Sequence, residues 1–520
     1  MFIFSILYLI ASLLFRLLVI SFIFGFILYM FVQLIHYKLK WQHKRSYSNN
    51  IKIISFVHPF CADCGGGEKV LWRMITSLIS LESQNPSNRG LPFQKLKINI
   101  ISGRKDNKLE LEKKLKDRFN IDLKFNSNSD NIFGNNVSDT FLQSRMINNR
   151  LVYEVELIPM RSGYMLRPKN FLTMLLQILG QIYFALEIVT NVYSDVYCDT
   201  TGLPFCYFIL KHFGHAKITA YTHYPFISYD MISQVQSNRA GVHSRGAHNK
   251  NNILKPIKLF YYKQILKLYK LMGNKCLSFS YVNSTWTYNR MKELWDELDK
   301  NQKLEILYPP CSISLYKEAA KNQQRENIIV SFAQFRPEKN QEMQIQILSK
   351  LKDRLNNYGG FQDLELHIIG GVRNSDDEKI LEELKVKSRK LGVQDYVKFL
   401  PNGSIEEIME EFSRAKIGIH TMIDEHFGIT LIEMMAAGLI VVTHNSAGAK
   451  DDILITKNNE EKPGFLVQNE NDYVKTIEEI LINYDEMKNL YIAPSRRRAE
   501  NFSDEAFEML FKKGLNKFLL

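Results

Sequence analysis

Two glutamates with a glycine between them, Glu425, Gly428 and Glu433, are the residues whose types and spacing most clearly allow chemistry. They lie between a strand-like run and a helical pattern that begins near Ile429. On one helix the two glutamates would lie about 12 Å apart along the axis, so we expect Glu425 in the loop and Glu433 one turn inside the helix.

Such a segment can hold a nucleotide sugar. One carboxylate would bind sugar hydroxyls and the other ribose hydroxyls. The amides at the start of the helix would bind the diphosphate, which Gly428 lets approach the backbone closely. The alternative, which spacing alone favours, is a pair of ordinary glutamates on a loop and a helix surface.

A glycine-rich turn at Gly65–Gly67, followed by Glu68, is a second place where a ligand can approach the backbone. It lacks the Gly-x-Gly-x-x-Gly spacing of a dinucleotide site. The nearby Cys61-x-x-Cys64 has no second cysteine pair, which argues against zinc. The chain also has no Asp-x-Asp triplet, which is consistent with metal independence, and Asp451-Asp452 is expected to be a solvated helix start.

Strands and helices that alternate along the chain must position these residues, and this alternation predicts parallel, doubly wound sheets. In the first half we expect a helix from Glu68 to Leu81 and strands at Ile51–Val57, Leu96–Ile101, Val192–Cys198 and Ile218–Thr222. After a break at Tyr308-Pro309-Pro310, the second half is predicted to have helices at 341–355, 376–391, 405–415 and 429–437, and strands at 328–332, 364–369, 397–400, 417–421 and 440–443.

The predicted fold class is therefore α/β, with two Rossmann-like doubly wound domains that face each other across a cleft. The expected boundaries are residues 46–310 for the first domain and 325–500 for the second, followed by a C-terminal helix at 501–520. The Asn/Ser-rich segment Asn126–Asn149 and the basic segment Gln234–Asn252 are expected to be loops.

A long apolar run opens the chain, in which Arg16 is the one charged side chain from Met1 to Tyr37. About 20 apolar residues are enough to cross a bilayer, and no cleavage site typical of a secretory signal is visible. Positive charges follow the run at Lys38, Lys40, Lys44 and Arg45. The positive-inside rule thus predicts a transmembrane anchor at residues 1–37 and cytosolic domains.

The charge balance, 67 Lys+Arg against 55 Asp+Glu, gives a net +12 and favours phosphorylated substrates, anionic membranes or nucleic acid as partners. No nucleic-acid module or aromatic–basic interleaving is present, so nucleic acid is not expected. Phe171–Val192 is either a buried core helix or a membrane contact. Lys255–Tyr281 is either a basic interfacial helix or a solvated one.

Glu425-His426-Phe427-Gly428 through Glu433 resembles the Glu-x-Phe-Gly-x-x-x-x-Glu signature of family 4 of the retaining GT-B glycosyltransferases. Further strings narrow the resemblance to the GDP-mannose-dependent α-1,2-mannosyltransferases of lipid-linked oligosaccharide synthesis, over nearly the whole chain past the anchor. These strings are His58–Cys61, Gly65–Glu68, Val70–Trp72, Tyr221–Pro225, Ser331–Lys339, His420–Gly428, Met435–Gly438 and His444–Ser446.

The resemblance implies a GT-B fold and transfer of mannose from GDP-mannose to the dolichol-diphosphate-linked trimannosyl-chitobiose, adding its fourth and fifth mannoses. It implies no metal or other cofactor, and a place on the cytosolic face of the endoplasmic reticulum membrane among membrane lipids. Association with other early mannosyltransferases is compatible with it. Two alternatives are a family 4 transferase with another donor or acceptor, and a non-catalytic membrane scaffold of the same fold.

Carried over by position, the resemblance makes Glu425 the sugar-orienting glutamate and Glu433 the ribose-binding one. Lys339 would contact the diphosphate, and His223 would lie near the sugar. Arg336 is expected to replace an arginine that the family has where this chain has Gln334. The other donor contacts would be His426, Phe427, Gly428, Ile429 and Thr430. Gly65, Gly66, Gly67 and Glu68 would form the loop for the acceptor or diphosphate, with Cys64 in place of a fourth glycine.

Overall fold

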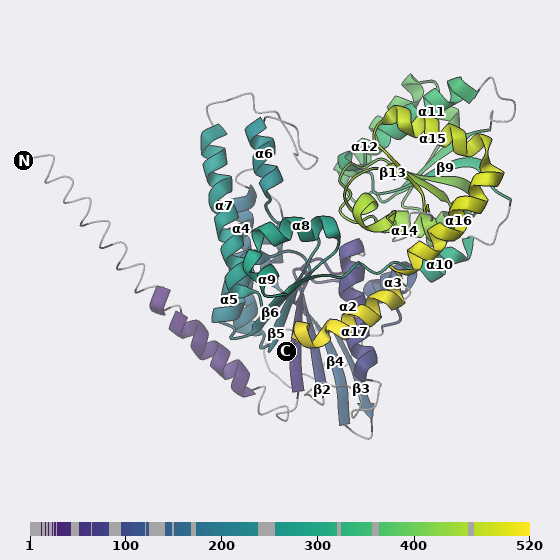
Figure 1. Cartoon of the computed structure of the whole chain (residues 1–520). Helices are drawn as coiled ribbons and strands as arrows, with labels where there is room; N and C mark the ends of the chain where they lie inside the picture. The colour runs from purple at the N-terminus through teal and green to yellow at the C-terminus, as the bar shows by residue number, and fades with distance from the viewer. Residues whose placement is uncertain are drawn as a thin grey trace, which may run out of the picture.

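The chain forms two α/β domains in the computed structural model (Figure 1). The residues that the structure describes are 12, 16, 19, 23, 25–27, 29–42, 51–63, 65–82, 95–119, 121–123, 141–147, 150–167, 173–237, 255–319, 324–355, 363–455 and 462–519. The predicted anchor at residues 1–37 lies largely outside this set and stays a prediction.

The first domain is built on an eight-stranded sheet with the order β3-β4-β2-β1-β5-β6-β7-β8. Its pairs are parallel except for β3 with β4, which is antiparallel. Its strands are β1 (Ile51–Val57), β2 (Lys95–Ser102), β3 (Phe141–Ile147), β4 (Arg150–Pro159), β5 (Val196–Asp199), β6 (Lys217–Thr222), β7 (Phe279–Val282) and β8 (Leu304–Ile306). Its helices are α2 (Gly66–Glu82), α3 (Lys108–Phe119), α4 (Thr173–Asn191), α5 (Tyr207–His212), α6 (Tyr229–Ser237), α7 (Lys255–Cys276), α8 (Thr285–Leu294) and α9 (Asp296–Lys300).

The second domain is built on a six-stranded parallel sheet with the order β11-β10-β9-β12-β13-β14. Its strands are β9 (Glu326–Phe332), β10 (Glu365–Gly370), β11 (Val397–Pro401), β12 (Ala415–His420), β13 (Ile440–His444) and β14 (Phe465–Val467). Its helices are α11 (Gln341–Leu355), α12 (Ser375–Lys390), α13 (Ile405–Arg414), α14 (Ile429–Ala436), α15 (Glu470–Ile482) and α16 (Tyr484–Glu500), preceded by α10 (Ile313–Lys317).

Local sequence explains much of this order. Apolar, largely β-branched strands such as β13 are buried along nearly their whole length, as in a sheet that is covered by helices on both faces. Helix α13 begins with a capping box, in which the Ser404 hydroxyl accepts from the Glu407 amide at 3.2 Å and the Glu407 carboxylate accepts from the Ser404 amide at 2.7 Å.

The last helix, α17 (Asp504–Leu519), returns from the second domain to the first. Its aromatic side chains Phe507, Phe511 and Phe518 belong to the same buried cluster as Phe279 and Tyr281 of β7. Figure 1 shows this helix, in yellow, lying against the purple and teal elements of the first domain. The chain end therefore ties the two domains together.

The α/β fold with two doubly wound domains is confirmed, and most predicted elements match within two residues. Three expectations were wrong in part. β5 begins at Val196 rather than Val192, because residues up to Asn191 continue helix α4. Residues 141–147 of the expected Asn/Ser-rich loop form strand β3 instead, which pairs with β4. Residues 234–237 of the expected basic loop belong to helix α6 instead. Residues 126–140 and 148–149 of the first expected loop and 238–252 of the second lie outside the described part of the chain.

Helix α4 is, within the described residues, the one helix that is long and apolar enough to cross a membrane. One side of it packs into the core through residues such as Phe184 and Ile188. The other side leaves Leu179 and Tyr183 half exposed, at 50% and 55%. The interpretation as a core helix is confirmed for one face, and membrane contact by the exposed face stays a prediction.

Candidate functional site

Glu425 lies between two basic side chains of the second domain. Its Oε2 is 2.5 Å from the Lys339 Nζ and 3.0 Å from the His420 Nε2. Burial alone raises the pKa of Glu425, but Lys339 and the hydrogen bond of His420 outweigh it and hold the pKa well below its ordinary value. Glu425 is therefore a carboxylate at neutral pH. It is not the solvated loop glutamate that spacing alone favoured.

The backbone on both sides of this ion pair is held in place. Lys339 ends a short 3-10 turn that starts at Pro337 and stops at Asn340 in the left-handed conformation, and the Thr421 hydroxyl donates to the Lys339 carbonyl at 2.9 Å. The residue before Glu425, Asp424, is also left-handed, with a φ of 58°. Its amide donates to the Ser446 hydroxyl at 2.9 Å, which fixes the loop that carries Glu425.

Helix α14 begins directly after this loop. Gly428 caps it with a φ of 110°, a left-handed conformation that glycine adopts without strain. The first amide to bond back to Gly428 is that of Leu431, so the amides of Ile429 and Thr430 make no bond within the helix. The Phe427 side chain is 3% exposed and packs on Tyr308 and Phe502, so a donor contact from this residue would have to come from its backbone.

Glu433 lies one turn inside α14, as predicted, and is 8% exposed. Burial, together with repulsion from Asp504, raises its pKa to about 7, although the charge of Lys69 opposes this rise. Lys69 comes from α2 of the first domain and lies 3.8 Å from Asp504 of α17. Glu433 thus lies where the two domains and the last helix meet.

The glycine-rich turn is organised by Glu68 and His58. Glu68 accepts from the Gly65 amide at 2.7 Å and is 3.1 Å from the His58 Nε2, while the His58 Nδ1 lies 2.8 Å from the Thr200 hydroxyl. Burial alone would raise the pKa of Glu68, but the hydrogen bonds from His58 and Gly65 lower it to about 2. Glu68 is therefore ionised, and its hydrogen bonds to Gly65 and His58 stabilise the turn.

His223 follows β6 and lies beside this turn. A Cβ at Gly67 would lie 3.4 Å from the His223 Nε2, so the turn packs directly against the imidazole. The Nε2 atom is buried and has no hydrogen-bond partner within the described residues. Burial and the neighbouring His58 lower the pKa of His223 to about 4, so the ring is neutral at pH 7. It can exchange a hydrogen bond with a ligand.

The two domains touch at these motifs. A Cβ at Gly66 would lie 3.1 Å from the Ile429 Cδ1, at the first residue of α14. His426 of the second domain stacks on Tyr224 and Trp286 of the first, with ring centroids 4.4 and 4.8 Å apart. The glycine-rich turn, His223 and the Glu425 loop therefore lie at one interface between the domains.

Asp452 is a further link between the domains. Its carboxylate accepts from the amide and hydroxyl of Thr285, at the start of α8, and from the Tyr308 hydroxyl at 2.9 Å. Burial raises its pKa and these hydrogen bonds oppose the rise. Asp452 does lie in a short helical segment, Ala449–Ile453, but it is only 1% exposed, so the expectation that it is solvated was wrong. It is a buried cap of a helix from the other domain.

Replacing Asp452 with alanine is expected to destabilise the protein by about 1–3 kcal/mol, because the Thr285 and Tyr308 donors lose their buried acceptor. The expected observation is a lower midpoint of thermal unfolding. The matched control is Asp451→Asn, at the half-buried neighbour. Equal midpoints for the two variants would contradict the role of Asp452.

Arg336 directly precedes the 3-10 turn that carries Lys339. Its guanidinium Nη1 lies 3.6 Å from Glu338, and its expected diphosphate contact remains a prediction. The described residues contain no group of three or more His, Cys, Asp or Glu side chains that could hold a metal ion.

Sequence reasoning missed Lys69, Asp504, Trp286 and the structural role of Asp452. Each acts through a partner far away in the chain, such as Thr285, which is 167 residues from Asp452. The sequence around a lysine or an aspartate does not indicate that its side chain is buried. The one available hint for Asp452 was the regular strand–helix order of the second half, which placed it after β13 and near the strand ends.

Two family descriptions match the chain. Residues 51–295 match "ALG11 mannosyltransferase N-terminus", and residues 313–497 match "Glycosyl transferases group 1". The human protein named GDP-Man:Man(3)GlcNAc(2)-PP-Dol alpha-1,2-mannosyltransferase is 33% identical over 474 residues, covering 90% of this chain and 87% of its own. A protein of the same name from Dictyostelium discoideum is 32% identical over 473 residues, covering 88% and 83%.

Solved structures show the same fold at low identity. Sucrose-phosphate synthase from Thermosynechococcus elongatus aligns with a TM-score of 0.58 at 13% identity, over 90% of this chain and 98% of that one. Anabaena Alr3699/HepE in complex with UDP-glucose aligns with a TM-score of 0.55 at 13% identity, over 89% and 99%. These likenesses show a two-domain glycosyltransferase fold, GT-B, and nothing finer.

Proposed function

The chain belongs to the ALG11 mannosyltransferase family, and from this premise we propose that it transfers mannose from GDP-mannose to Man(3)GlcNAc(2)-diphosphate-dolichol in α-1,2 linkage. It is a glycosyltransferase of group 1. The observation that carries the proposal is the Glu425 carboxylate, held by Lys339 and His420, at an interface where the partnerless His223 nitrogen and the glycine-rich turn meet α14.

The donor would occupy the second domain. The Glu425 carboxylate would orient hydroxyls of the mannose, and Glu433 would accept from those of the ribose. The diphosphate would lie at the start of α14, where the Ile429 and Thr430 amides face it, with Lys339 as the nearby cation. Lys339 would then exchange its bond to Glu425 for one to phosphate.

The reaction would retain the configuration at the anomeric carbon. The bond between that carbon and the departing phosphate oxygen breaks, and a bond to a mannose 2-hydroxyl of the acceptor forms on the same face. The proton of that hydroxyl passes to the departing phosphate, so no protein nucleophile is required. Lys339 and the α14 amides would stabilise the negative charge that develops on GDP.

The acceptor is a lipid, and an apolar surface of the first domain suits it. Helices α4, α5 and α7 lie together on one side of that domain, with the helical residues 29–42 beside them (Figure 1). They expose Leu179, Phe208, Phe260 and Leu271, while α7 also carries lysines. These features support membrane association, which accords with the dolichol-linked acceptor that the relatives' names state. The predicted anchor and the cytosolic side of the endoplasmic reticulum membrane belong to the same proposal.

The ionisation of Glu433 gives a test of its place at the ribose. A carboxylate with a pKa of about 7 is mostly protonated at pH 6 and mostly ionised at pH 8. The ionised carboxylate accepts more strongly from the ribose hydroxyls than the protonated carboxyl does, so the KM for GDP-mannose is expected to be higher at pH 6 than at pH 8, by up to about tenfold. Glu433→Gln should remove this dependence. An equal pH dependence in that variant would contradict the assignment.

Donor specificity tests the proposal as a whole. With a trimannosyl lipid acceptor, transfer is expected from GDP-mannose and not from UDP-glucose or UDP-galactose, measured as radiolabelled lipid product. Transfer from a UDP-sugar would favour another group 1 transferase. No transfer from any donor by folded protein would favour a scaffold.

A further inference from the structure

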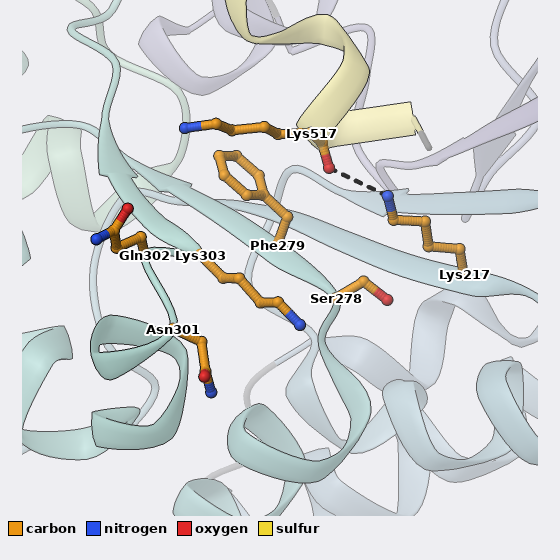
Figure 2. Close-up of a pocket in the computed structure, with 7 residues that line it drawn as sticks. All are labelled: Lys217, Ser278, Phe279, Asn301, Gln302, Lys303 and Lys517. Atoms are coloured by element: carbon orange, nitrogen blue, oxygen red, sulfur yellow. Dashed lines mark hydrogen bonds between the residues drawn. The ribbon is translucent and has the colours of Figure 1, made fainter.

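A cavity lined by three lysines lies at the amino ends of strands in the first sheet. Its volume is about 690 Å³, and Figure 2 shows the side chains that line it. Its lining residues are Lys217, Ser278, Phe279, Asn301, Gln302, Lys303 and Lys517. Lys217 begins β6 and Phe279 begins β7, whereas His223 follows the carboxyl end of β6. The cavity therefore lies at the amino ends of these strands, whereas the proposed transfer site lies at their carboxyl ends.

Positive charge in this cavity is only partly neutralised. Lys517 pairs with Glu305, and its backbone carbonyl accepts from the Lys217 Nζ at 3.1 Å. Within the described residues, neither Lys217 nor Lys303 has a carboxylate within ion-pair distance. Burial, and then the charges of Lys52 and Lys303, lower the pKa of Lys217 to about 8. These lysines would be stabilised by an anion.

The remaining lining suits a phosphate group. The Ser278 hydroxyl and the Gln302 side-chain amide add neutral hydrogen-bond groups to the lining, whereas the Asn301 amide already donates to the Glu297 carbonyl at 2.6 Å. Phe279, which is 1% exposed, forms an apolar floor that packs against Phe518 of α17. A cavity of this size has room for a phosphate with an attached organic group.

The cavity is also close to the N-terminal helical segment. The His215 Nε2 lies 2.7 Å from the Gln33 Oε1 of residues 29–42, and Lys217 follows His215 by two residues. At about 3.3 Å per residue, the Cα atom of Lys217 lies no more than about 7 Å from that of His215. If residues 29–42 continue the predicted anchor, the cavity lies on the side of the domain that faces the lipid.

We propose that the lysine cavity binds a phosphate group with net negative charge, carried by an anionic lipid headgroup or by a soluble phosphate. The grounds are the half-buried Lys217, Lys303 without an ion-pair partner among the described residues, and the Ser278 hydroxyl and Gln302 amide in the same lining. This site does not depend on the transfer reaction.

The test is lysine acetylation of the full chain in non-ionic detergent, quantified by peptide mass spectrometry. Four samples are compared: micelles alone, and micelles with phosphatidic acid, with diacylglycerol or with inorganic phosphate. A bound anion keeps an amine protonated, with a pKa rise of at least about one unit, so acetylation of Lys217 should fall about tenfold. Lys379, a 76% exposed lysine on α12, is the internal control.

Protection of Lys217 by phosphatidic acid but not by inorganic phosphate would support a lipid ligand, and protection by both would support the phosphate group itself. Protection by inorganic phosphate alone would support a soluble ligand. Lys303→Gln should weaken whichever protection is seen, and Lys379→Gln should not. No protection in any sample, or equal protection by diacylglycerol, would overturn the proposal.

Discussion

Replacing Glu425 with glutamine is expected to reduce mannose transfer by about 10³-fold, mainly through kcat. The substitution keeps the shape of the side chain but removes the negative charge that Lys339 and His420 hold in place. The amide has only one acceptor oxygen, so the transferred sugar would lose part of its orientation. Glu425→Ala should show at least the same loss. The measurement is the initial rate at saturating GDP-mannose.

Two controls separate this loss from misfolding. Glu406→Gln changes an exposed glutamate of α13 and should keep the wild-type rate. The midpoint of thermal unfolding shows whether the Glu425 variant remains folded. A folded Glu425→Gln protein with a near-normal rate would contradict the assignment of Glu425 to the transfer site.

Replacing Lys339 with methionine is expected to lower kcat/KM by about 10²-fold to 10³-fold. The ammonium would no longer stabilise the charge that GDP acquires as it leaves. Lys339→Arg should recover part of the loss, because a guanidinium keeps the charge and can bind phosphate oxygens.

The same variant should also show a new pH dependence. Burial raises the pKa of Glu425, and Lys339 is the largest influence that opposes it. Without Lys339 the pKa of Glu425 should rise. At saturating GDP-mannose, where the pH dependence of KM does not enter, the residual kcat should therefore increase with pH over a range where the wild-type kcat is level. Residual activity with the wild-type pH profile would contradict the coupling of these two side chains.

The second domain was the more predictable of the two, for physical reasons. Its strands are short apolar runs, and helix α11 could be placed at Gln341–Leu355 because its apolar positions repeat with the helical period. In the first domain, β3 is an edge strand inside an Asn/Ser-rich segment without such a pattern. Helix α17 could be predicted as a helix, but not as part of the first domain's core.

In the site, too, some features could be predicted from local sequence and others could not. Glu425, Gly428 and Glu433 could be placed from spacing, and the start of α14 agrees. The His420 contact with Glu425 and the stacking of His426 on Trp286 depend on how loops and domains meet. No local pattern carries that information. Asp452 is an example. The acidic pair Asp451-Asp452 suggested a solvated residue, but Asp452 is buried and accepts from Thr285 of the other domain.

Linkage analysis of the product is the measurement that tests the central claim most directly. The full chain is incubated with GDP-mannose and a defined Man(3)GlcNAc(2)-diphosphate lipid, and the released glycan is methylated and compared with the starting glycan. The proposal predicts new terminal mannose and new 2-substituted mannose, both lost after α-1,2-mannosidase treatment. Product with another linkage, or active enzyme that leaves this acceptor unchanged while it extends a different lipid, would contradict it.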